Sequence, residues 1–430
     1  MSKTISIRVP AITRVEGEGA LDLDIVAGNI ETLRLRIYEP PRVFEKFLQG
    51  RDSQQVLDMV ARICGICPVA YQMSAAQAIE NCFGVKLSPW AKAMRRLLYC
   101  GEWIESHSLH MHLLALPDFF GYDSAIEMAK IYPQEVTRGM QLQALGNDIV
   151  ALLGKRSVHP VGVAIGGFHH APTLDNVNTL RQRLEGGLEQ AEALLNWLPE
   201  INLPEDHQVL NCVAISQAEG YAMIDGDIVS SQGLNLPQAQ FYEHFKEEQV
   251  PYSTAKHCLL DGKPYLVGPL ARLHLNYDDL PQPVKDVWQK VGIDLSTDNM
   301  FHSIYARAIE MYFALYEAHR ILSAYEYTEH PAEKFVPKAG VGYGCTEAPR
   351  GMLWHRYEMA ADGTVIEADI VPPTSQNQAQ IEANLYSALQ KFGLDREEND
   401  IRLHSEMVIR NYDPCISCST HFLNVNMKRR

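Results

Sequence analysis

The spacing of apolar residues changes along the chain, from a strand-like period near the N-terminus to a helical period further on. Residues 21–25 alternate between apolar and polar side chains, and residues 33–37 do the same. Alternation of this kind is typical of strands with one buried face. Gly28-Asn29 between the two runs has the chemistry of a tight turn. Residues 4–38 are therefore predicted to form strands that include a hairpin.

From about residue 42 the apolar residues recur with the 3.6-residue period of an amphipathic helix. Ser53 is predicted to cap a helix that runs into the first of two cysteine motifs. Glycine and proline break the regular structure at that motif and turn its two thiols toward one point. Helices are predicted over residues 43–48, 53–60, 74–79, 89–154 in two or three segments divided near Pro117 and Pro133, 176–198, 299–327 and 379–391.

Residues 207–280 differ from the helical regions on both sides of them. Short apolar runs separated by glycines and prolines predict a smaller α+β lobe there. Further on, Asp362-Gly363 predicts the turn of a second hairpin. We therefore predict an α+β, predominantly helical fold with a central bundle of long helices. It forms a single domain, 1–430, whose sub-regions are the N-terminal strands (1–41), a helical part with the first cysteine pair (42–200), the lobe (207–280), a part with a helix, a hairpin and the second cysteine pair (299–421), and a C-terminal tail (422–430).

The composition excludes several classes of protein. The chain has 430 residues, of which 46% are hydrophobic and 21% charged, as in an ordinary globular protein. Its formal net charge of −15 argues against binding of nucleic acid, which requires basic surfaces. No apolar run is long enough to span a membrane, and the N-terminus lacks the apolar core of a signal peptide. Nine cysteines without a regular framework indicate a reducing compartment, so a cytoplasmic location is expected, with export on a partner's signal as the alternative.

Two CxxC pairs stand near opposite ends of the chain. Cys64 and Cys67 form the first pair, and Cys415 and Cys418 form the second. Four thiolates brought together make a soft site for a late transition metal. Structural zinc sites usually bring their pairs within about 15–20 residues of each other, whereas most of the chain separates these two. The pattern alone is compatible with structural zinc, an iron–sulfur cluster or a catalytic transition metal.

Other polar residues have more ordinary interpretations. His107 and His110 fall on one face of a predicted helix, but they lack a matching third ligand and are expected to be core histidines. Arg14 and Glu16, which stand close to glycines, are interpreted at this level as a solvated strand edge. The glycine-rich residues 154–170 lack the order of a phosphate-binding loop. They are expected at a subunit contact or over a buried site.

Motifs distributed along the whole chain make the identity of the metal more specific. Arg62-Ile63-Cys64-Gly65-Ile66-Cys67-Pro68 and Asp413-Pro414-Cys415-Ile416-Ser417-Cys418-Ser419-Thr420-His421 resemble the two metal-binding signatures of nickel–iron hydrogenase large subunits. The related large subunit of respiratory complex I keeps the fold but lacks these cysteines, and all four are present here. The family's other motifs are matched, in the family's order, by residues 13–17, 44–52, 347–351 and 371–374.

The resemblance implies a nickel ion held by Cys64, Cys67, Cys415 and Cys418. Cys67 and Cys418 are expected to bridge to an iron that carries carbon monoxide and cyanide, and Cys64 and Cys415 to bind nickel alone. The implied activity is reversible heterolytic cleavage of H2. Cys415 is then the nearest candidate base, and Glu16 matches the glutamate that passes the proton on.

Further residues are assigned through the same resemblance. Arg350 matches an arginine poised over the open metal position, where its cation would polarise the substrate. Glu45 and His421 match the ligands of a separate magnesium (or iron) ion, with waters and a backbone carbonyl expected as the remaining ligands. The residues expected around the metal pair are Asp118, Pro349, Pro373, Thr374, whose hydroxyl would donate to a cyanide, and Asp413.

Two departures from the family's usual pattern matter. Many relatives have a histidine where this chain has Tyr71, which favours the cytosolic, NAD(P)-linked branch, also called sulfhydrogenases, with sulfur reduction as a side activity. Large subunits are commonly cut after the final histidine by a maturation endopeptidase, once nickel-insertion proteins have loaded the metal. Residues 422–430 follow His421 here and are interpreted as either a precursor tail or a short retained one.

The other cysteines are single, and no nucleotide-binding glycine motif is present. Electrons are therefore expected to leave through an iron–sulfur small subunit, and then through a flavin subunit, which exchanges them with NAD(P). The iron–sulfur clusters and the flavin would all belong to partner subunits. The alternatives are a large subunit linked to heterodisulfide reductase, and a non-catalytic subunit that keeps the cysteines as a structural or sensory metal site.

Overall fold

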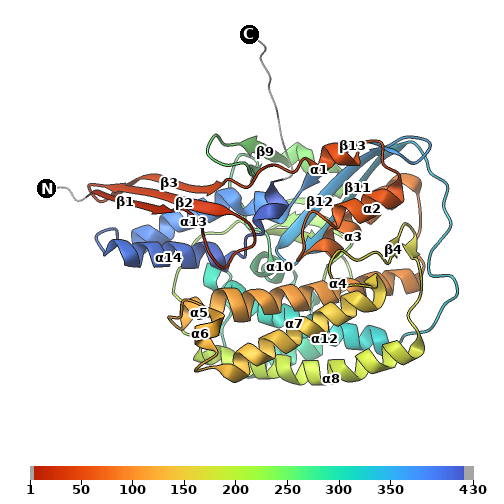
Figure 1. Cartoon of the computed structure of the whole chain (residues 1–430), viewed down its shortest axis with the longest axis horizontal. Helices are drawn as coiled ribbons and strands as arrows, with labels where there is room; N and C mark the ends of the chain where they lie inside the picture. Colours follow the sequence, from red (N-terminus) through yellow and green to blue (C-terminus); the bar gives the residue numbers. More distant parts are fainter. Residues whose placement is uncertain (1–3, 421–430) are drawn as a thin grey trace, which may run out of the picture.

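The computed structural model describes residues 4–420, and helices dominate it (Figure 1). The N-terminal part is a three-stranded antiparallel sheet in the order β1-β2-β3. The predicted turn is present, with Gly28 at φ 78°, a conformation that suits glycine. The predicted strands are thereby confirmed as β1 (Thr4–Val9), β2 (Gly19–Val26) and β3 (Asn29–Ile37).

A bundle of four long helices forms the half of the molecule that lies lower in Figure 1. These helices are α4 (Pro89–Leu109), α7 (Pro133–Gly154), α8 (Leu174–Trp197) and α12 (Ser303–Ser323). α4 packs against α7 and α12, and α8 packs against the same two helices. Where α4 crosses α7, a Cβ on Gly146 would lie 2.5 Å from the backbone nitrogen of Glu105, so the two backbones touch. The predicted central bundle is confirmed.

The helical pitch changes between α4 and α7. The chain continues from α4 into a π-helical turn, His110–Ala115, and then into α5 (Leu116–Phe119), whose first turn contains Pro117. After α6 (Ala125–Met128), Pro133 is the first residue of α7. The predicted division of this region near the two prolines is therefore confirmed. π-turns of this kind occur frequently at functional sites.

The helix that leads into the first cysteine motif is α2 (Ser53–Val60), and its cap differs from the prediction. The N-cap is Asp52, whose carboxylate accepts the backbone N–H groups of Gln54 and Gln55. The Gln55 side chain in turn accepts the backbone N–H of Asp52. The prediction of Ser53 as the cap was wrong by one residue, because the aspartate before it completes this reciprocal capping box.

A second antiparallel sheet supports the first cysteine pair. α3 (Pro68–Phe83) lies against its first strand, where a Cβ on Gly342 or Gly344 would overlap the backbone of α3. The predicted turn at Asp362-Gly363 joins its second and third strands. The strands, in sheet order, are β11 (Gly340–Ala348), β12 (Gly351–Met359) and β13 (Val365–Val371).

The region of residues 207–280 contains a three-stranded sheet and a two-stranded sheet. Its apolar side chains form a second hydrophobic cluster together with Cys345, Trp354 and Val371 of the C-terminal sheet. The two regions therefore share one core. The elements here are β6 (Val213–Ser216), β7 (Asp227–Ser230), β8 (Asn235–Leu236), α9 (Phe241–His244), β9 (Phe245–Gln249), β10 (Lys256–Leu260) and α10 (Pro269–Asn276).

Two packed helices lead to the second cysteine pair, α13 (Pro373–Phe392) and α14 (Glu398–Asn411). The sequence predicted α13, whereas no helix was predicted over the residues of α14. None of the helices within residues 4–420 is long and apolar enough to cross a membrane. The remaining elements are α1 (Phe44–Leu48), β4 (Val163–Ala164), β5 (Gly167–Phe168), α11 (Gln282–Val291) and 3-10 turns at Leu198–Glu200, Gln238–Gln240, Tyr277–Asp279, Met300–His302 and Ile416–Ser419.

Candidate metal centre

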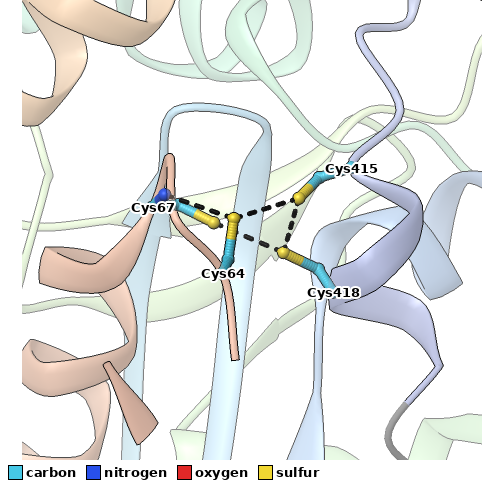
Figure 2. Close-up of side chains that lie close together, drawn as sticks. All are labelled: Cys64, Cys67, Cys415 and Cys418. Atoms are coloured by element: carbon cyan, nitrogen blue, oxygen red, sulfur yellow. Dashed lines mark hydrogen bonds between the residues drawn. The ribbon is translucent and has the colours of Figure 1, made fainter. Parts of the chain in front are cut away.

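The two cysteine pairs meet in the interior (Figure 2). Cys64 lies in the loop between α2 and α3, and Cys67 directly precedes Pro68, which starts α3. Cys415 directly precedes the 3-10 turn Ile416–Ser419, and Cys418 lies within that turn, near the C-terminal end of the described residues. The Sγ atoms of Cys64 and Cys415 are 3.3 Å apart, those of Cys67 and Cys418 3.4 Å, and those of Cys415 and Cys418 2.7 Å.

All four sulfur atoms lie within 4.8 Å of one another, and all four residues are buried. Four soft donors at this spacing fit one or two late transition metal ions. Burial raises the pKa of Cys415 and Cys418, whereas hydrogen bonds from the other thiols lower the pKa of Cys64. A cation would stabilise all four thiolates together. The donor set therefore fits the nickel that the sequence predicted.

The second cysteine loop is fixed by contacts from distant parts of the chain. Its Cys415 backbone N–H donates to Thr374 Oγ1 at 3.0 Å, and the N–H of Ile416 donates to the carbonyl of Glu16 at 2.9 Å. Arg42 donates through one guanidinium nitrogen to the carbonyls of Ile63 and Ser417, one in each cysteine motif. These bonds hold the two motifs in one arrangement.

Glu16 touches the cysteine cluster directly. The Cys415 thiol donates to Glu16 Oε2 at 3.2 Å, and the backbone N–H of Ser417 donates to the same oxygen at 3.0 Å. Burial, followed by the charge of Cys64, raises the pKa of Glu16. The interpretation of Glu16 as a solvated strand edge is therefore wrong, because the second cysteine loop packs over it.

Arg350 follows β11 and lies beside the cluster, fully enclosed. Its Nε donates to the carbonyl of Asp413 and its Nη2 to Asp413 Oδ1, both at 2.9 Å, and its Nη1 donates to Ser106 Oγ at 3.3 Å. Burial disfavours the guanidinium charge, but Asp413 and the thiolates outweigh it and hold the pKa of Arg350 well above its usual value. A permanent cation therefore faces the sulfur atoms.

Comparison with known proteins identifies the family. A model of the family described as nickel-dependent hydrogenase matches residues 42–138 and 208–421. The chain belongs to the nickel-dependent hydrogenase family. The alpha subunit of sulfhydrogenase 1 from Pyrococcus furiosus is 31% identical over 429 residues, which cover 98% of this chain and 99% of the relative. A subunit of the F420-non-reducing hydrogenase from Methanothermobacter marburgensis is 31% identical over 460 residues, with coverages of 99% and 96%.

Solved structures show the same fold. An NAD+-reducing NiFe-hydrogenase in its H2-reduced state matches with a TM-score of 0.88 at 24% identity, covering 97% of this chain and 99% of that one. A NiFeSe-hydrogenase of Dm. baculatum matches with a TM-score of 0.79 at 21% identity, with coverages of 97% and 100%. This chain thus has the fold of a hydrogenase large subunit, from an oxidoreductase that acts on H2.

Three further residues were expected around the metal pair of this hydrogenase chain, and the structure gives each of them its own surroundings. Pro373 is the first residue of α13, directly before Thr374. The carbonyl of Pro349 accepts a hydrogen bond from Arg272 at 3.0 Å. Asp118 pairs with Arg14 and Arg410, and within residues 4–420 it makes no hydrogen bond to a cysteine or to Arg350. Arg14, like Glu16, is therefore held by a contact with a residue far away in the sequence and is not a solvated strand edge.

The predicted ligands of the second ion are only partly described. Glu45 lies in α1, and its Oε1 accepts the backbone N–H of Ile370 at 2.7 Å. Burial raises the pKa of Glu45 to about 8. His421 lies outside the described residues, as do the predicted tail residues 422–430.

Several buried charged residues near the site were not predicted from the sequence. Arg272 donates to both Glu310 and Glu347 and to the carbonyls of Ala348 and Pro349, and so positions the segment that carries Arg350. Nothing in the sequence around Arg272 marks it. Glu347 belongs to a motif that the sequence analysis recognised, and only its role as the partner of Arg272 was missed.

Two glutamates of α4 were also not predicted from the sequence. Glu102 accepts the backbone N–H groups of Val69 and Ala70, at 2.6 and 3.0 Å, at the start of α3 beside the first cysteine pair. Glu105 is buried in the neighbourhood of Cys64 and Arg350, and burial raises the pKa of Glu105 to about 8. The sequence did offer one signal for them, because two acidic residues stand three positions apart on the buried face of a predicted helix.

The two histidines of α4 and the π-turn are core residues, as predicted. His107 Nε2 lies 2.9 Å from Glu310 Oε2, and His110 Nε2 lies 2.8 Å from the carbonyl of Arg410. Burial lowers the pKa of His107 to about 4 and that of His110 to about 3, so both rings are neutral. They belong to the packing around the site rather than to a metal.

Proposed function

We propose that this large subunit catalyses reversible heterolytic cleavage of H2 and delivers the electrons to NAD(P), first through an iron–sulfur small subunit, then through a flavin subunit. The observation that carries the catalytic part is the contact between Cys415 and Glu16. It places a half-buried carboxylate, which accepts protons, against one sulfur of a four-thiol metal site. A purely structural metal site does not require this neighbour.

Cys64, Cys67, Cys415 and Cys418 would together hold nickel and iron. When bound, this centre, with carbon monoxide and cyanide on its iron, supplies the chemistry that binds and splits H2. Cys415 accepts the released proton on Sγ and passes it to Glu16 Oε2, which is 3.2 Å away. In H2 evolution the same two atoms carry the proton inward.

Arg350, Asp413 and Thr374 would prepare the site for this step. Arg350 supplies a fixed cation beside the sulfur atoms, and two contacts with Asp413 hold its orientation. Thr374 Oγ1 accepts the N–H of Cys415, which leaves its own hydrogen free to donate toward a cyanide on the iron. Glu45 is proposed as a ligand of a separate magnesium (or iron) ion, with His421 as the second protein ligand.

Replacing Arg350 with lysine should lower the rate of H2 uptake on the order of 10²-fold, as the loss of one preorganised donor does in other enzymes. Lysine keeps the charge but lacks the fork that contacts Asp413 twice. Uptake is measured with an artificial viologen acceptor, together with nickel content. Arg356→Lys is the matched control, because Arg356 contacts Glu367 and Asp369 away from the site. Equal rates in the two variants would remove Arg350 from the reaction.

The route of the electrons is supported by what the chain contains. Within residues 4–420, the four cysteines are the one group of three or more His, Cys, Asp or Glu side chains placed to hold a metal. No relay of clusters can therefore be built from this part of the chain, and a partner with iron–sulfur clusters is needed. The sulfhydrogenase relatives and the fold match with an NAD+-reducing hydrogenase support NAD(P) as the final acceptor, and a cytoplasmic location goes with that acceptor.

A second acceptor is favoured by one observation. Subunits of F420-non-reducing hydrogenases are up to 31% identical to this chain, close to the 31% and 33% of the two sulfhydrogenase subunits. These relatives are named for not reducing F420, and the link to heterodisulfide reductase that the sequence resemblance left open is the alternative route for the electrons. It changes the partners and leaves the chemistry at Cys415 and Glu16 unchanged.

The acceptor is tested by purifying the complex anaerobically through a tag on this chain. We expect a flavoprotein and an iron–sulfur small subunit to co-purify, and H2-dependent reduction of NADP+ or NAD+ as well as of viologen. A complex that reduces viologen, contains heterodisulfide reductase subunits and reduces neither nucleotide would contradict the NAD(P) route alone. A complex that oxidises no H2 with any acceptor would contradict the catalytic proposal.

A further inference from the structure

A second carboxylate, Glu39, contacts the same cysteine loop as Glu16. Ser417, between the two cysteines of the second pair, contacts both acids. Its backbone N–H donates to Glu16 Oε2 at 3.0 Å, and its hydroxyl donates to Glu39 Oε2 at 3.2 Å. The Ser417 side chain also interacts with the Glu16 carboxylate. One small polar residue therefore connects the carboxylate next to Cys415 with another for which no hydrogen bond to a cysteine is found within residues 4–420.

The space between the two acids depends on Gly17. A Cβ at this position would lie 2.8 Å from Glu39 Oε2 and 3.0 Å from the backbone nitrogen of Ser417. Gly17 also has φ 87°, a conformation that favours glycine. The absence of a side chain here lets Glu39 approach the backbone next to Glu16 and reach Ser417.

This series of groups leads from a fully buried thiol to partly exposed side chains. Cys415 is fully buried, and Glu16, which contacts it, is partly buried. The Glu39 side chain keeps 17% of its surface exposed, and Arg42 beside it, with Nε 4.0 Å from Glu39 Oε1, keeps 32%. Glu39 therefore touches both the interior chain of contacts and the solvent.

We propose that Glu39 is the proton carrier that follows Glu16, with the Ser417 hydroxyl as the link between them. The inference rests on the proposed role of Glu16. During H2 uptake the Glu16 carboxylic acid gives its proton to Ser417 Oγ while that hydroxyl gives its own proton to Glu39 Oε2. Glu16 returns to a carboxylate, Ser417 remains a neutral alcohol, and Glu39 becomes a carboxylic acid that releases the proton to water. H2 evolution runs through the same atoms in reverse.

The test compares Glu39→Gln with Glu18→Gln in the metal-loaded complex. Glu18 is an exposed acid one residue beyond Gly17, so its replacement is the matched control. For Glu39→Gln we expect unchanged nickel content and exchange between H2 and D2O slowed on the order of 10²-fold, the lower end of what positioned proton-transfer groups contribute. The solvent isotope effect should increase, and a high concentration of a small buffer acid should restore part of the rate. Glu39→Asp should retain more activity than Glu39→Gln.

Infrared difference spectra between H2 and argon give a readout independent of turnover. A carboxylic acid C=O signal should disappear in Glu39→Gln and persist in Glu18→Gln. If Glu39→Gln matches the control in exchange rate, isotope effect and spectrum, Glu39 is not the carrier. The role of Glu16 then stands provided that Glu16→Gln slows exchange by about 10²-fold or more. Loss of nickel in Glu39→Gln would also overturn the proposal, because it would show that Glu39 only holds the cysteine loop in place.

Discussion

Replacing Glu16 with glutamine is expected to lower exchange between H2 and D2O by about 10²–10⁴-fold, the range that positioned proton-transfer groups contribute. The amide oxygen of the new side chain can still accept the backbone N–H of Ser417, so the second cysteine loop should stay docked. The amide cannot take a proton from Cys415 and pass it on. The variant should therefore keep its nickel and lose its proton exit.

Exchange is measured by mass spectrometry on the purified complex, with nickel content determined on the same sample. Glu18→Gln is again the control, because it removes an exposed acid two residues away without touching the cluster. Normal exchange in Glu16→Gln would exclude Glu16 from the proton route. Proton release from the cluster would then require another acceptor, and Glu105, a buried acid near Cys64 and Arg350, would be the next residue to replace.

Replacing Cys418 with serine is expected to abolish activity through loss of metal. The Cys418 sulfur lies 3.4 Å from that of Cys67 and 2.7 Å from that of Cys415, so it contributes to the centre of the cluster. A hydroxyl is a hard, weakly acidic donor that binds nickel poorly in place of a thiolate. The loss of affinity should exceed the about 10–100-fold that removal of an outer partner of a metal ligand typically costs.

The measurement is the amount of nickel and iron per chain in the purified variant. Cys212→Ser is the matched control, because Cys212 is a buried, free thiol outside the cluster. The control should retain its metals, and both variants should retain the helical circular dichroism of the parent. A full complement of nickel in Cys418→Ser would contradict the assignment of Cys418 as a ligand.

Local sequence signals predicted most elements of the fold. The turns at Gly28 and at Asp362-Gly363 depend on residues that stand next to each other, and both are confirmed. Pro89 and Pro133 begin α4 and α7 because proline fits the first turn of a helix. α14 was not recognised as a helix, because its acids and bases interrupt the apolar period that the prediction used.

Some residues of the site could be predicted from the sequence and others could not, for a physical reason. The four cysteines carry their chemistry in their spacing, and the structure brings all four together. Arg272, Glu102 and Glu39 act through contacts with segments far away in the sequence, and no local pattern reports such contacts. Arg14 is a further residue whose contact could not be predicted from a local pattern. Next to glycines it has the pattern of an exposed edge, and only the fold brings Asp118 to it.

In the proposed function, the four cysteines hold a nickel–iron pair with carbon monoxide and cyanide on the iron. Infrared spectroscopy of the anaerobically purified, mature complex tests it most directly, because those ligands absorb where protein groups do not. We predict carbon monoxide and cyanide bands, about one nickel per chain, and a change in band positions on addition of H2. A mature complex with one zinc per chain, no nickel and no such bands would contradict the claim.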